Sequence, residues 1–156
     1  MDLYLARHGS AEDAALDAER ILTKRGTKET EAMGRWLRKL RLEMDFIWHS
    51  DRVRARQTAA ILHKKLKSRP EISQVEGLKP NDDPKAILEK LKTTAAKRGM
   101  IVGHLPHLGK LAALLLSGNA GGTVVELEKS AVLCLSNDSG NWAVRWLIHP
   151  GIAPDA

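Results

Sequence analysis

The stretch Asp2-Leu3-Tyr4-Leu5-Ala6-Arg7-His8-Gly9 runs from apolar residues directly into a fixed cation, an imidazole and a glycine. Its apolar part predicts a buried strand over residues 2–6. In open α/β sheets, ligands bind in the crevice beyond the carboxyl ends of the strands. We therefore expect Arg7, His8 and Gly9 to lie beside a ligand, where Arg7 supplies a positive charge and His8 a nucleophilic ring nitrogen.

Strand-like and helix-like segments alternate along the rest of the chain. Residues 10–20 lack clear periodicity and predict a loop over the crevice, after which Thr23 is the expected N-cap of a helix. Further helices are expected from about Arg52, Pro84 and Pro106, and strands over 45–48, 72–75, 100–102, 123–127, 131–135 and 142–147. This alternation predicts an α/β fold with a mostly parallel central sheet flanked by helices. We expect a single domain over residues 1–150 and a frayed tail over residues 151–156.

The composition is that of an ordinary globular domain. Hydrophobic residues make up 43% of the 156 residues, which allows a real core. The longest apolar run, Leu111 to Leu116, is far shorter than the roughly 20 residues that a membrane span needs. Cys134 is the only cysteine, so an intrachain disulfide and a cysteine-based metal cage are excluded. Together with the lack of a visible signal peptide, these features favour a cytoplasmic protein with no membrane partner.

The net charge of +6 comes mainly from the middle of the chain, where residues 35–69 contain eleven Lys and Arg residues and three acidic ones. Such a run is either the solvated faces of two helices or a surface that attracts a phosphorylated or acidic partner. Nucleic acid is the weaker interpretation. The chain has one Phe and one Tyr, no basic–aromatic interleaving, and no zinc-finger or RNA-binding motif.

Three predicted strands end in polar side chains of related chemistry. Arg7-His8 follows the first strand, His49-Ser50 follows the second and leads to Arg54, and Gly103-His104 follows the strand over 100–102. The carboxyl ends of parallel strands lie at the same edge of a sheet, so histidines and arginines can converge there. The start of the helix that carries Arg54 adds free backbone N–H groups and a partial positive charge. Arginine forks match the oxygens of a phosphoryl group, so the pattern predicts a phosphoryl site.

Four motifs, in this order, resemble the histidine phosphatase superfamily, whose members share the fold of the phosphoglycerate mutases. They are Arg7-His8-Gly9, the run from Arg20 to Gly26 with Leu22-Thr23, the run from Ser50 to Thr58 with Arg54-Ala55 and Gln57-Thr58, and Gly103-His104-Leu105-Pro106. The short length and the two middle motifs resemble the smallest branch, the SixA-type phosphohistidine phosphatases. The resemblance extends from about residue 2 to about residue 148, and it implies a three-layer phosphoglycerate mutase-like fold.

The resemblance implies a role for each matching residue. His8 would be the nucleophile and would carry the phosphoryl group transiently on a ring nitrogen. Arg7 and Arg54 would clamp the phosphoryl oxygens, and His104 would form a hydrogen bond to one of them. A phosphoryl group in transit is stabilised chiefly by positioning and positive charge, so this set implies no metal and no other cofactor. The His8 ring must be neutral to attack, and neighbouring arginines are expected to lower its pKa.

Three further residues have supporting roles in this interpretation. Gly9 would let the backbone approach the site, Arg20 would lie at its rim, and Ser50 would cap the helix that follows it. The pair His104 and His107 resembles two metal ligands, but no third ligand is near in the sequence. We therefore expect His107 at the rim of the site instead.

The proton donor for the leaving group is the least defined part of the pattern. Larger relatives carry a dedicated carboxyl acid on an insertion, whereas the chain between Thr58 and Met100 is short here and offers Glu76 as a candidate. An alkoxide leaving group needs a proton strongly, because water-like oxygens have a pKa near ~16. An imidazole leaving group, with a pKa near ~6.5, needs far less help. A protein-borne phosphohistidine is therefore the expected substrate, and the missing insertion implies a shallow crevice that such a partner can reach.

Two other functions remain open from the residues alone. One is a small-molecule phosphomonoesterase of the same superfamily, and the other is a non-catalytic module that binds phosphoproteins. A metal-independent phosphohistidine phosphatase with a phospho-His8 intermediate is preferred, because binding alone would not require a nucleophile. We expect a monomer whose partner is a histidine-phosphorylated phosphotransfer or carrier protein, and no nucleic acid.

Overall fold

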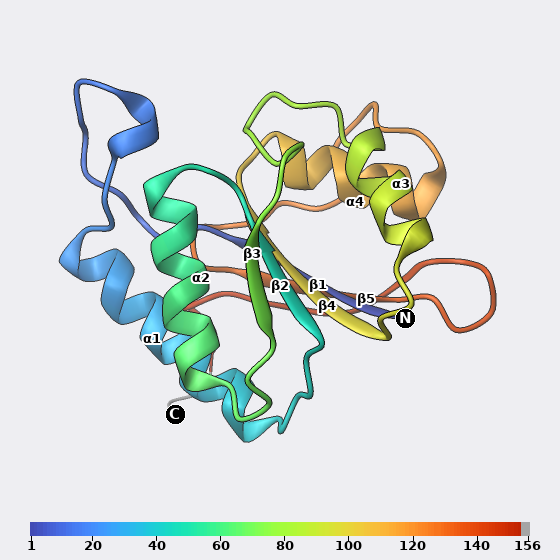
Figure 1. Cartoon of the computed structure of the whole chain (residues 1–156), viewed down its shortest axis with the longest axis horizontal. Coiled ribbons are helices and arrows are strands. Elements are labelled where there is room, and N and C mark those ends of the chain that lie inside the picture. Colours follow the sequence, from blue (N-terminus) through green and yellow to red (C-terminus); the bar gives the residue numbers. More distant parts are fainter. Residues whose placement is uncertain (154–156) are drawn as a thin grey trace.

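A six-stranded sheet forms the middle of three layers (Figure 1). The computed structural model describes residues 1–153. The strands are β1 (Asp2–Arg7), β2 (Phe46–His49), β3 (Glu71–Gln74), β4 (Arg98–Gly103), β5 (Val132–Ser136) and β6 (Ala143–Ile148). Their order across the sheet is β3-β2-β4-β1-β5-β6. The first four strands pair in parallel, and β5 and β6 continue the sheet antiparallel, so the predicted α/β fold with a mostly parallel sheet is confirmed.

Helices cover both faces of the sheet. α1 (Lys24–Lys39) and α2 (Val53–Lys65) lie on one face, and α3 (Lys85–Thr93) and α4 (His107–Ser117) lie on the other (Figure 1). A short 3-10 helix, η1 (Asp17–Glu19), interrupts the loop between β1 and α1. The Gly26 N–H donates to the Thr23 hydroxyl oxygen at 2.9 Å, which confirms Thr23 as the N-cap of α1. Of the helices in residues 1–153, none has the length and apolar character that crossing a membrane requires.

β1 shows how the two-residue period of a strand builds a core on each face of the sheet. Leu3 and Leu5 belong to the apolar cluster beneath α3 and α4. Tyr4 and Ala6 belong to the cluster beneath α1 and α2. A strand that is covered on both faces has a continuous apolar sequence, and this is why residues 2–6 could be recognised as a buried strand.

Residues 123–127 are not a strand, which corrects the sequence prediction. β1 already pairs with β4 on one side and with β5 on the other, so it has no free edge beside it for a further strand. The chain instead runs irregularly from α4 to β5. In this segment the Leu127 carbonyl accepts a hydrogen bond from the Arg7 guanidinium at 2.8 Å.

The chain after β6 begins with a hydrogen-bonded turn. The N–H groups of Ile152 and Ala153 lie 3.1 Å and 2.9 Å from the His149 carbonyl oxygen, to which both donate. Ala153 also packs against the cluster beneath α1 and α2. The sequence predicts a frayed tail over residues 151–156; residues 151–153 belong to this turn, and residues 154–156 lie outside the described part of the chain.

Gly99 in β4 is packed too closely to accept a side chain. A Cβ atom there would collide with the ring of Phe46, which stacks on Trp48 with ring centroids 4.0 Å apart. We predict that Gly99→Ala lowers the free energy of unfolding by about 1–3 kcal/mol, as overpacked cores do, measured by urea unfolding. Gly103→Ala in the same strand is the matched control, because its Cβ atom would meet Leu108 at an ordinary 3.5 Å. An equal loss in both variants would contradict the prediction.

Candidate active site

The carboxyl ends of β1, β2 and β4 meet at one edge of the sheet, as expected for parallel strands. A pocket of about 640 Å³ lies there. It is lined by Arg7, His8, Arg54 and His104 together with Arg20. The structure therefore brings together the residues that four separate motifs contribute.

The His8 ring is buried and held in one tautomer. Its backbone N–H donates to the Gly103 carbonyl at 3.0 Å, which extends the contact between β1 and β4 beyond Arg7. The ring atom Nδ1 lies 2.7 Å from the Gly9 carbonyl oxygen. A carbonyl can only accept, so Nδ1 carries the hydrogen and Nε2 of the neutral ring keeps its lone pair. Nε2 is therefore the atom that can attack phosphorus.

Burial is the main reason why the His8 ring stays neutral. Loss of solvent is the largest cause that lowers the pKa of His8 to about 4. The charges of Arg54, Arg7 and Arg20 lower it further, and the hydrogen bond to the Gly9 carbonyl partly opposes them. The expected influence of the arginines is present, but burial of the ring has the larger effect. At pH 7 the His8 ring is therefore uncharged, which is the form that a histidine nucleophile needs.

Arg7 and Arg54 present fixed guanidinium groups to the pocket. Nη1 of Arg7 donates to the Leu127 carbonyl at 2.8 Å, and Nη1 of Arg54 donates to the Asp17 carbonyl at 2.9 Å. The Nε atoms of both arginines are buried and have no hydrogen-bond partner among residues 1–153. Desolvation lowers the pKa of both groups. Two arginines that are fixed in this way can bind the oxygens of a phosphoryl group.

His104 lies beside His8, with the two ring centroids 5.0 Å apart. Its Nε2 atom is 2.6 Å from the Ser50 hydroxyl oxygen, and its buried Nδ1 atom has no partner within the described residues. Burial and, next, the charge of His8 lower the pKa of His104 to about 3, so this ring is also neutral at pH 7. When the Ser50 hydroxyl donates to Nε2, the hydrogen of the neutral His104 ring is on Nδ1 and available to a ligand.

Ser50 contacts His104 and does not cap α2, which corrects the expected capping role. The N-cap of α2 is Arg52, and no side chain caps the helix. Ser50 lies two residues before that position, where its hydroxyl oxygen is 3.3 Å from the Arg52 backbone nitrogen. The structure thus makes Ser50 a neighbour of the second histidine.

The motif that contains Arg54, Gln57 and Thr58 connects α2 to the loop after β1 through hydrogen bonds. The Gly9 N–H donates to the Thr58 hydroxyl oxygen at 3.1 Å, and that hydroxyl donates to the Arg54 carbonyl at 2.8 Å. Oε1 of Gln57 accepts the Leu22 N–H at 2.8 Å. These contacts explain why Gln57 and Thr58 follow Arg54 in the sequence.

Gly9 is required by packing behind the site. A Cβ atom at Gly9 would lie 2.9 Å from Thr30 Oγ1 and 3.0 Å from the Gly26 carbonyl oxygen, both in α1. Neither contact leaves room for a methyl group. Position 9 therefore requires glycine because helix α1 packs closely against it. The sequence interpretation had instead expected this glycine to let the backbone approach the ligand site.

Asp17 is a site residue that the sequence interpretation missed. Its carboxylate pairs with Arg54 at 3.2 Å, with Arg20 at 3.4 Å and with Arg52 at 3.5 Å. Desolvation raises the pKa of this carboxyl, but the charge of Arg54 and hydrogen bonds from Arg54 and Arg20 outweigh it, so the pKa is lowered overall. An ionised side chain of the protein therefore occupies the cationic pocket. The surrounding loop has no periodicity, so the sequence carried little signal for this contact.

The positive charge of the pocket comes from scattered parts of the chain. Its cationic lining residues are Arg7, Arg20, Arg52, Arg54, Lys79 and Lys129. Of the eleven basic residues at 35–69, Arg52 and Arg54 line this pocket, whereas Arg38, Arg41 and Lys67 line a separate hollow. The basic middle region therefore supplies a small part of the site, and no motif had pointed to Lys79 or Lys129.

Glu76 and His107 are not among the residues that line the pocket. Glu76 is exposed, so the candidate acid is not placed beside a leaving group. His107 is fully buried as the first residue of α4, which corrects its expected place at the rim, and burial lowers its pKa. Within residues 1–153, no group of three or more His, Cys, Asp or Glu side chains is arranged to hold a metal ion.

Comparison with known proteins identifies the family. The sequence pattern of the histidine phosphatase superfamily (branch 1) matches residues 3–80, which include His8 and Arg54. The phosphohistidine phosphatase SixA of Escherichia coli K12 is 30% identical over 155 residues, which cover 96% of this chain and 94% of SixA. The chain belongs to the histidine phosphatase superfamily, in its SixA-type branch. It is thus a phosphatase of this superfamily.

Solved structures confirm the fold. A structure of the protein histidine phosphatase SixA complexed with tungstate has a TM-score of 0.86 and 29% identity, and the match covers 97% of this chain and 98% of that chain. The alpha-ribazole phosphatase from Shigella flexneri has a TM-score of 0.80 over 100% of both chains, but at 14% identity it shows the shared fold alone. The expected three-layer, phosphoglycerate mutase-like architecture is therefore confirmed.

Asp17 competes with anionic ligands for Arg54, because both need the same guanidinium group. We predict that Asp17→Asn lowers the inhibition constant of inorganic phosphate about fivefold, since an exposed ion pair contributes up to ~1 kcal/mol. The constant is measured with p-nitrophenyl phosphate as the substrate. Asp13→Asn, in the same loop but outside the pocket, is the control. Weaker phosphate inhibition in Asp17→Asn than in the wild type would mean that Asp17 chiefly positions Arg54, contrary to the prediction.

The lowered pKa of His8 can be measured directly. A histidine whose pKa is lower in the folded state than in the unfolded state, where it is near ~6.5, stabilises the folded protein at pH values above ~6.5. This stabilisation is lost as the pH falls through the pKa of the folded state. We predict that the ring NMR signal of His8, assigned by its loss in His8→Gln, stays constant down to about pH 5 and moves near about pH 4. A midpoint near ~6.5 would refute the dominant effect of burial.

Proposed function

We propose that this protein is a metal-independent phosphohistidine phosphatase that removes phosphoryl groups from histidine side chains of proteins. The observation that carries the proposal is that His8 is buried and neutral and lies in a pocket lined by six arginine and lysine residues. The 30% identity to the phosphohistidine phosphatase SixA along nearly the whole chain supports it.

In the first step, Nε2 of His8 attacks the phosphorus atom of the substrate phosphohistidine. The bond from phosphorus to Nε2 forms while the bond from phosphorus to the substrate ring nitrogen breaks. The substrate ring carries a proton on its other nitrogen, keeps the electron pair of the broken bond and leaves as neutral imidazole. Arg7 and Arg54 bind the phosphoryl oxygens, and Nδ1–H of His104 donates to one of them. Fixed positive charge in a partly dry pocket stabilises the transition state with little reorganisation.

In the second step, water attacks the phosphorus atom of phospho-His8. The bond to Nε2 breaks, inorganic phosphate leaves with the oxygen of the water, and the protons of the water pass to phosphate and solvent. The hydrogen bond from Nδ1 to the Gly9 carbonyl holds the ring in the same orientation throughout, so the nitrogen that accepts the phosphoryl group also releases it. Two steps through a covalent intermediate replace one difficult displacement.

Leaving-group chemistry favours phosphohistidine over a phosphate ester. Two carboxyl side chains line the pocket, Asp17 and Asp82. The pKa of Asp17 is lowered and that of His104 is about 3, so neither carries the proton that an alkoxide would need at pH 7. Oδ2 of Asp82 accepts the backbone N–H of Lys79 at 2.9 Å. A phosphohistidine ring that is protonated on its other nitrogen leaves as neutral imidazole, whose conjugate acid has a pKa near ~6.5, without such help. The cationic lining of the pocket also favours a partner with acidic residues around its phosphohistidine.

Comparison of two substrate types tests the proposal. We expect kcat/KM for a protein that has been phosphorylated on histidine with phosphoramidate to exceed that for an alkyl phosphate such as O-phosphoserine by about tenfold or more, because the alkoxide leaving group of the ester requires a proton donor. His8→Gln should abolish turnover and should also prevent the transfer of acid-labile, base-stable radiolabel to the enzyme. His63→Gln, outside the pocket, is the matched control.

Three outcomes would reject parts of this proposal. A strong preference for the phosphate ester would favour a small-molecule phosphomonoesterase. Phosphate-dependent binding without turnover would favour a module that only binds phosphoproteins. Turnover that persists in His8→Gln would remove His8 as the nucleophile.

A further inference from the structure

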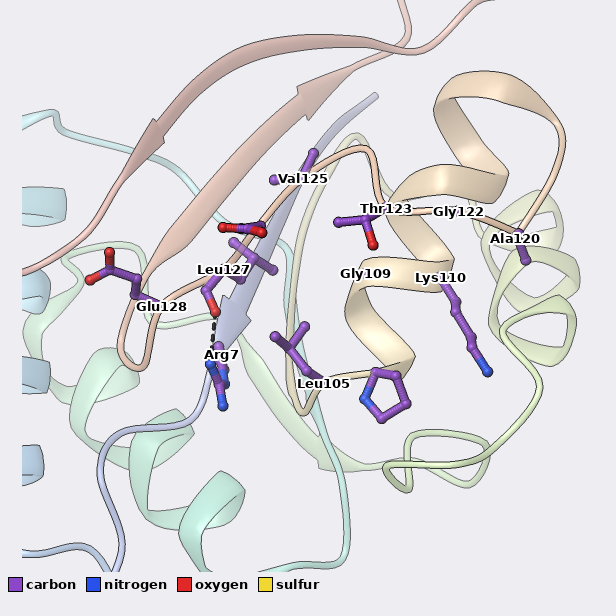
Figure 2. A pocket seen from close by; sticks show the side chains of 13 residues that line it. Arg7, Leu105, Gly109, Lys110, Ala120, Gly122, Thr123, Val125, Leu127 and Glu128 are labelled. Atoms are coloured by element: carbon purple, nitrogen blue, oxygen red, sulfur yellow. Dashed lines mark hydrogen bonds between the residues drawn. The ribbon is translucent and has the colours of Figure 1, made fainter.

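A second hollow adjoins the active-site pocket, between α4 and the irregular segment before β5 (Figure 2). We call it the α4 groove. It has a volume of about 620 Å³. Leu105, Gly109 and Lys110 line it on the side of α4, and Thr123, Val125 and Leu127 line it on the other side.

The α4 groove is continuous with the active-site pocket. Arg7 and Leu105 line both hollows. Figure 2 shows Arg7 at one end of the groove and Lys110 toward the other. A molecule that places its phosphoryl group against His8 therefore has the end of this groove directly beside it.

The chemistry of the groove differs from that of the pocket. Leu105 and Val125 give it apolar walls, and Leu127 packs behind them in the core. Its charged lining residues besides Arg7 are Lys110, Glu126 and Glu128. The active-site pocket has six arginine and lysine residues in its lining. Leu105 and Val125 are partly exposed although both pack against the core. An exposed apolar hollow beside a charged site is suited to an apolar side chain of a ligand that the charged site already holds.

The short side chain of a phosphohistidine indicates which part of a protein substrate lies over the α4 groove. Because this side chain is short, a phosphohistidine that reaches His8 keeps the substrate backbone at the mouth of the pocket. The residues that flank it must then lie on the adjoining surface. On one side that surface is cationic, with Arg52 and Lys79, and on the other side it is the α4 groove. The two sides are complementary to acidic and apolar residues, respectively.

We propose that the α4 groove is the docking site for the chain that flanks the phosphohistidine of a protein substrate, and that it takes an apolar side chain of that chain. This inference rests on the proposed phosphohistidine phosphatase activity. The groove wall is also joined to the catalytic clamp, because the Leu127 carbonyl accepts the hydrogen bond from Arg7 Nη1 at 2.8 Å (Figure 2). A docked chain therefore rests on the same segment that fixes Arg7.

A pair of synthetic phosphohistidine peptides tests the docking site. Both carry the same acidic residues, and they differ in having leucine or serine next to the phosphohistidine. We expect kcat/KM of the wild type to be about tenfold higher for the leucine peptide, which is the range that one apolar side chain contributes in a pocket. Free N-phosphohistidine, which has no flanking chain, serves as the reference substrate.

Variants of the groove wall complete the test. Thr123 is exposed, so Thr123→Trp should fill the groove without disturbing the core, and Val125→Asp should make its wall polar. Both should abolish the preference for the leucine peptide and leave hydrolysis of free N-phosphohistidine unchanged. Val124→Asp is the matched control, because Val124 is 48% exposed and does not line the groove.

The outcomes separate this inference from the proposed function. Equal rates for both peptides in the wild type, or a preference that survives Thr123→Trp, would overturn the docking site and leave the phosphohistidine phosphatase activity intact. Loss of free N-phosphohistidine hydrolysis in a folded Thr123→Trp variant would overturn it as well, since the groove would then serve small substrates. A wild type that hydrolyses none of the phosphohistidine compounds would reject the proposed function itself.

Discussion

The backbone hydrogen bonds around His8 are the constraint on which the site depends. β1 lies between β4 and β5, and its pairing continues beyond the strand. The His8 N–H donates to the Gly103 carbonyl at 3.0 Å, and the His8 carbonyl accepts the Ser130 N–H at 3.2 Å. His8, the proposed nucleophile, is thus held from both sides by backbone hydrogen bonds, and His104 follows Gly103 directly. His8 and His104 are neighbours because the parallel strands β1 and β4 are neighbours.

Burial and charge act together in this pocket. Loss of solvent keeps His8 and His104 neutral, and it makes the charges of Arg7 and Arg54 costly unless an anion lies near them. In the structure, Asp17 provides that anion for Arg54. A phosphoryl group also carries negative charge, and it offers more oxygens than a carboxylate to the guanidinium group. The pocket therefore has its own carboxylate as a weak counter-ion, and a stronger anion can displace it.

The surroundings of the pocket, more than the fold, distinguish phosphatases of this architecture. The same three-layer fold is found in a SixA structure and in an alpha-ribazole phosphatase. Fold alone therefore says little about the substrate. In this chain the informative features are the cationic rim, the Asp17 carboxyl with its lowered pKa and the apolar α4 groove beside Arg7. All three are suited to a phosphoryl group on a protein-borne imidazole.

The sequence by itself determined six of the seven expected strands, the four α-helices and the convergence of Arg7, His8, Arg54 and His104. Apolar periodicity and an N-cap are local properties, and parallel strands must end at one edge. The tertiary structure decided the rest. The sequence predicts an edge strand over residues 123–127, but the chain runs irregularly there from α4 to β5, and β1 already pairs with β4 and β5. Asp17 meets Arg54 because a loop folds back over 37 positions of sequence. The low pKa of His8 comes chiefly from burial, a property of the packed molecule that no sequence motif records.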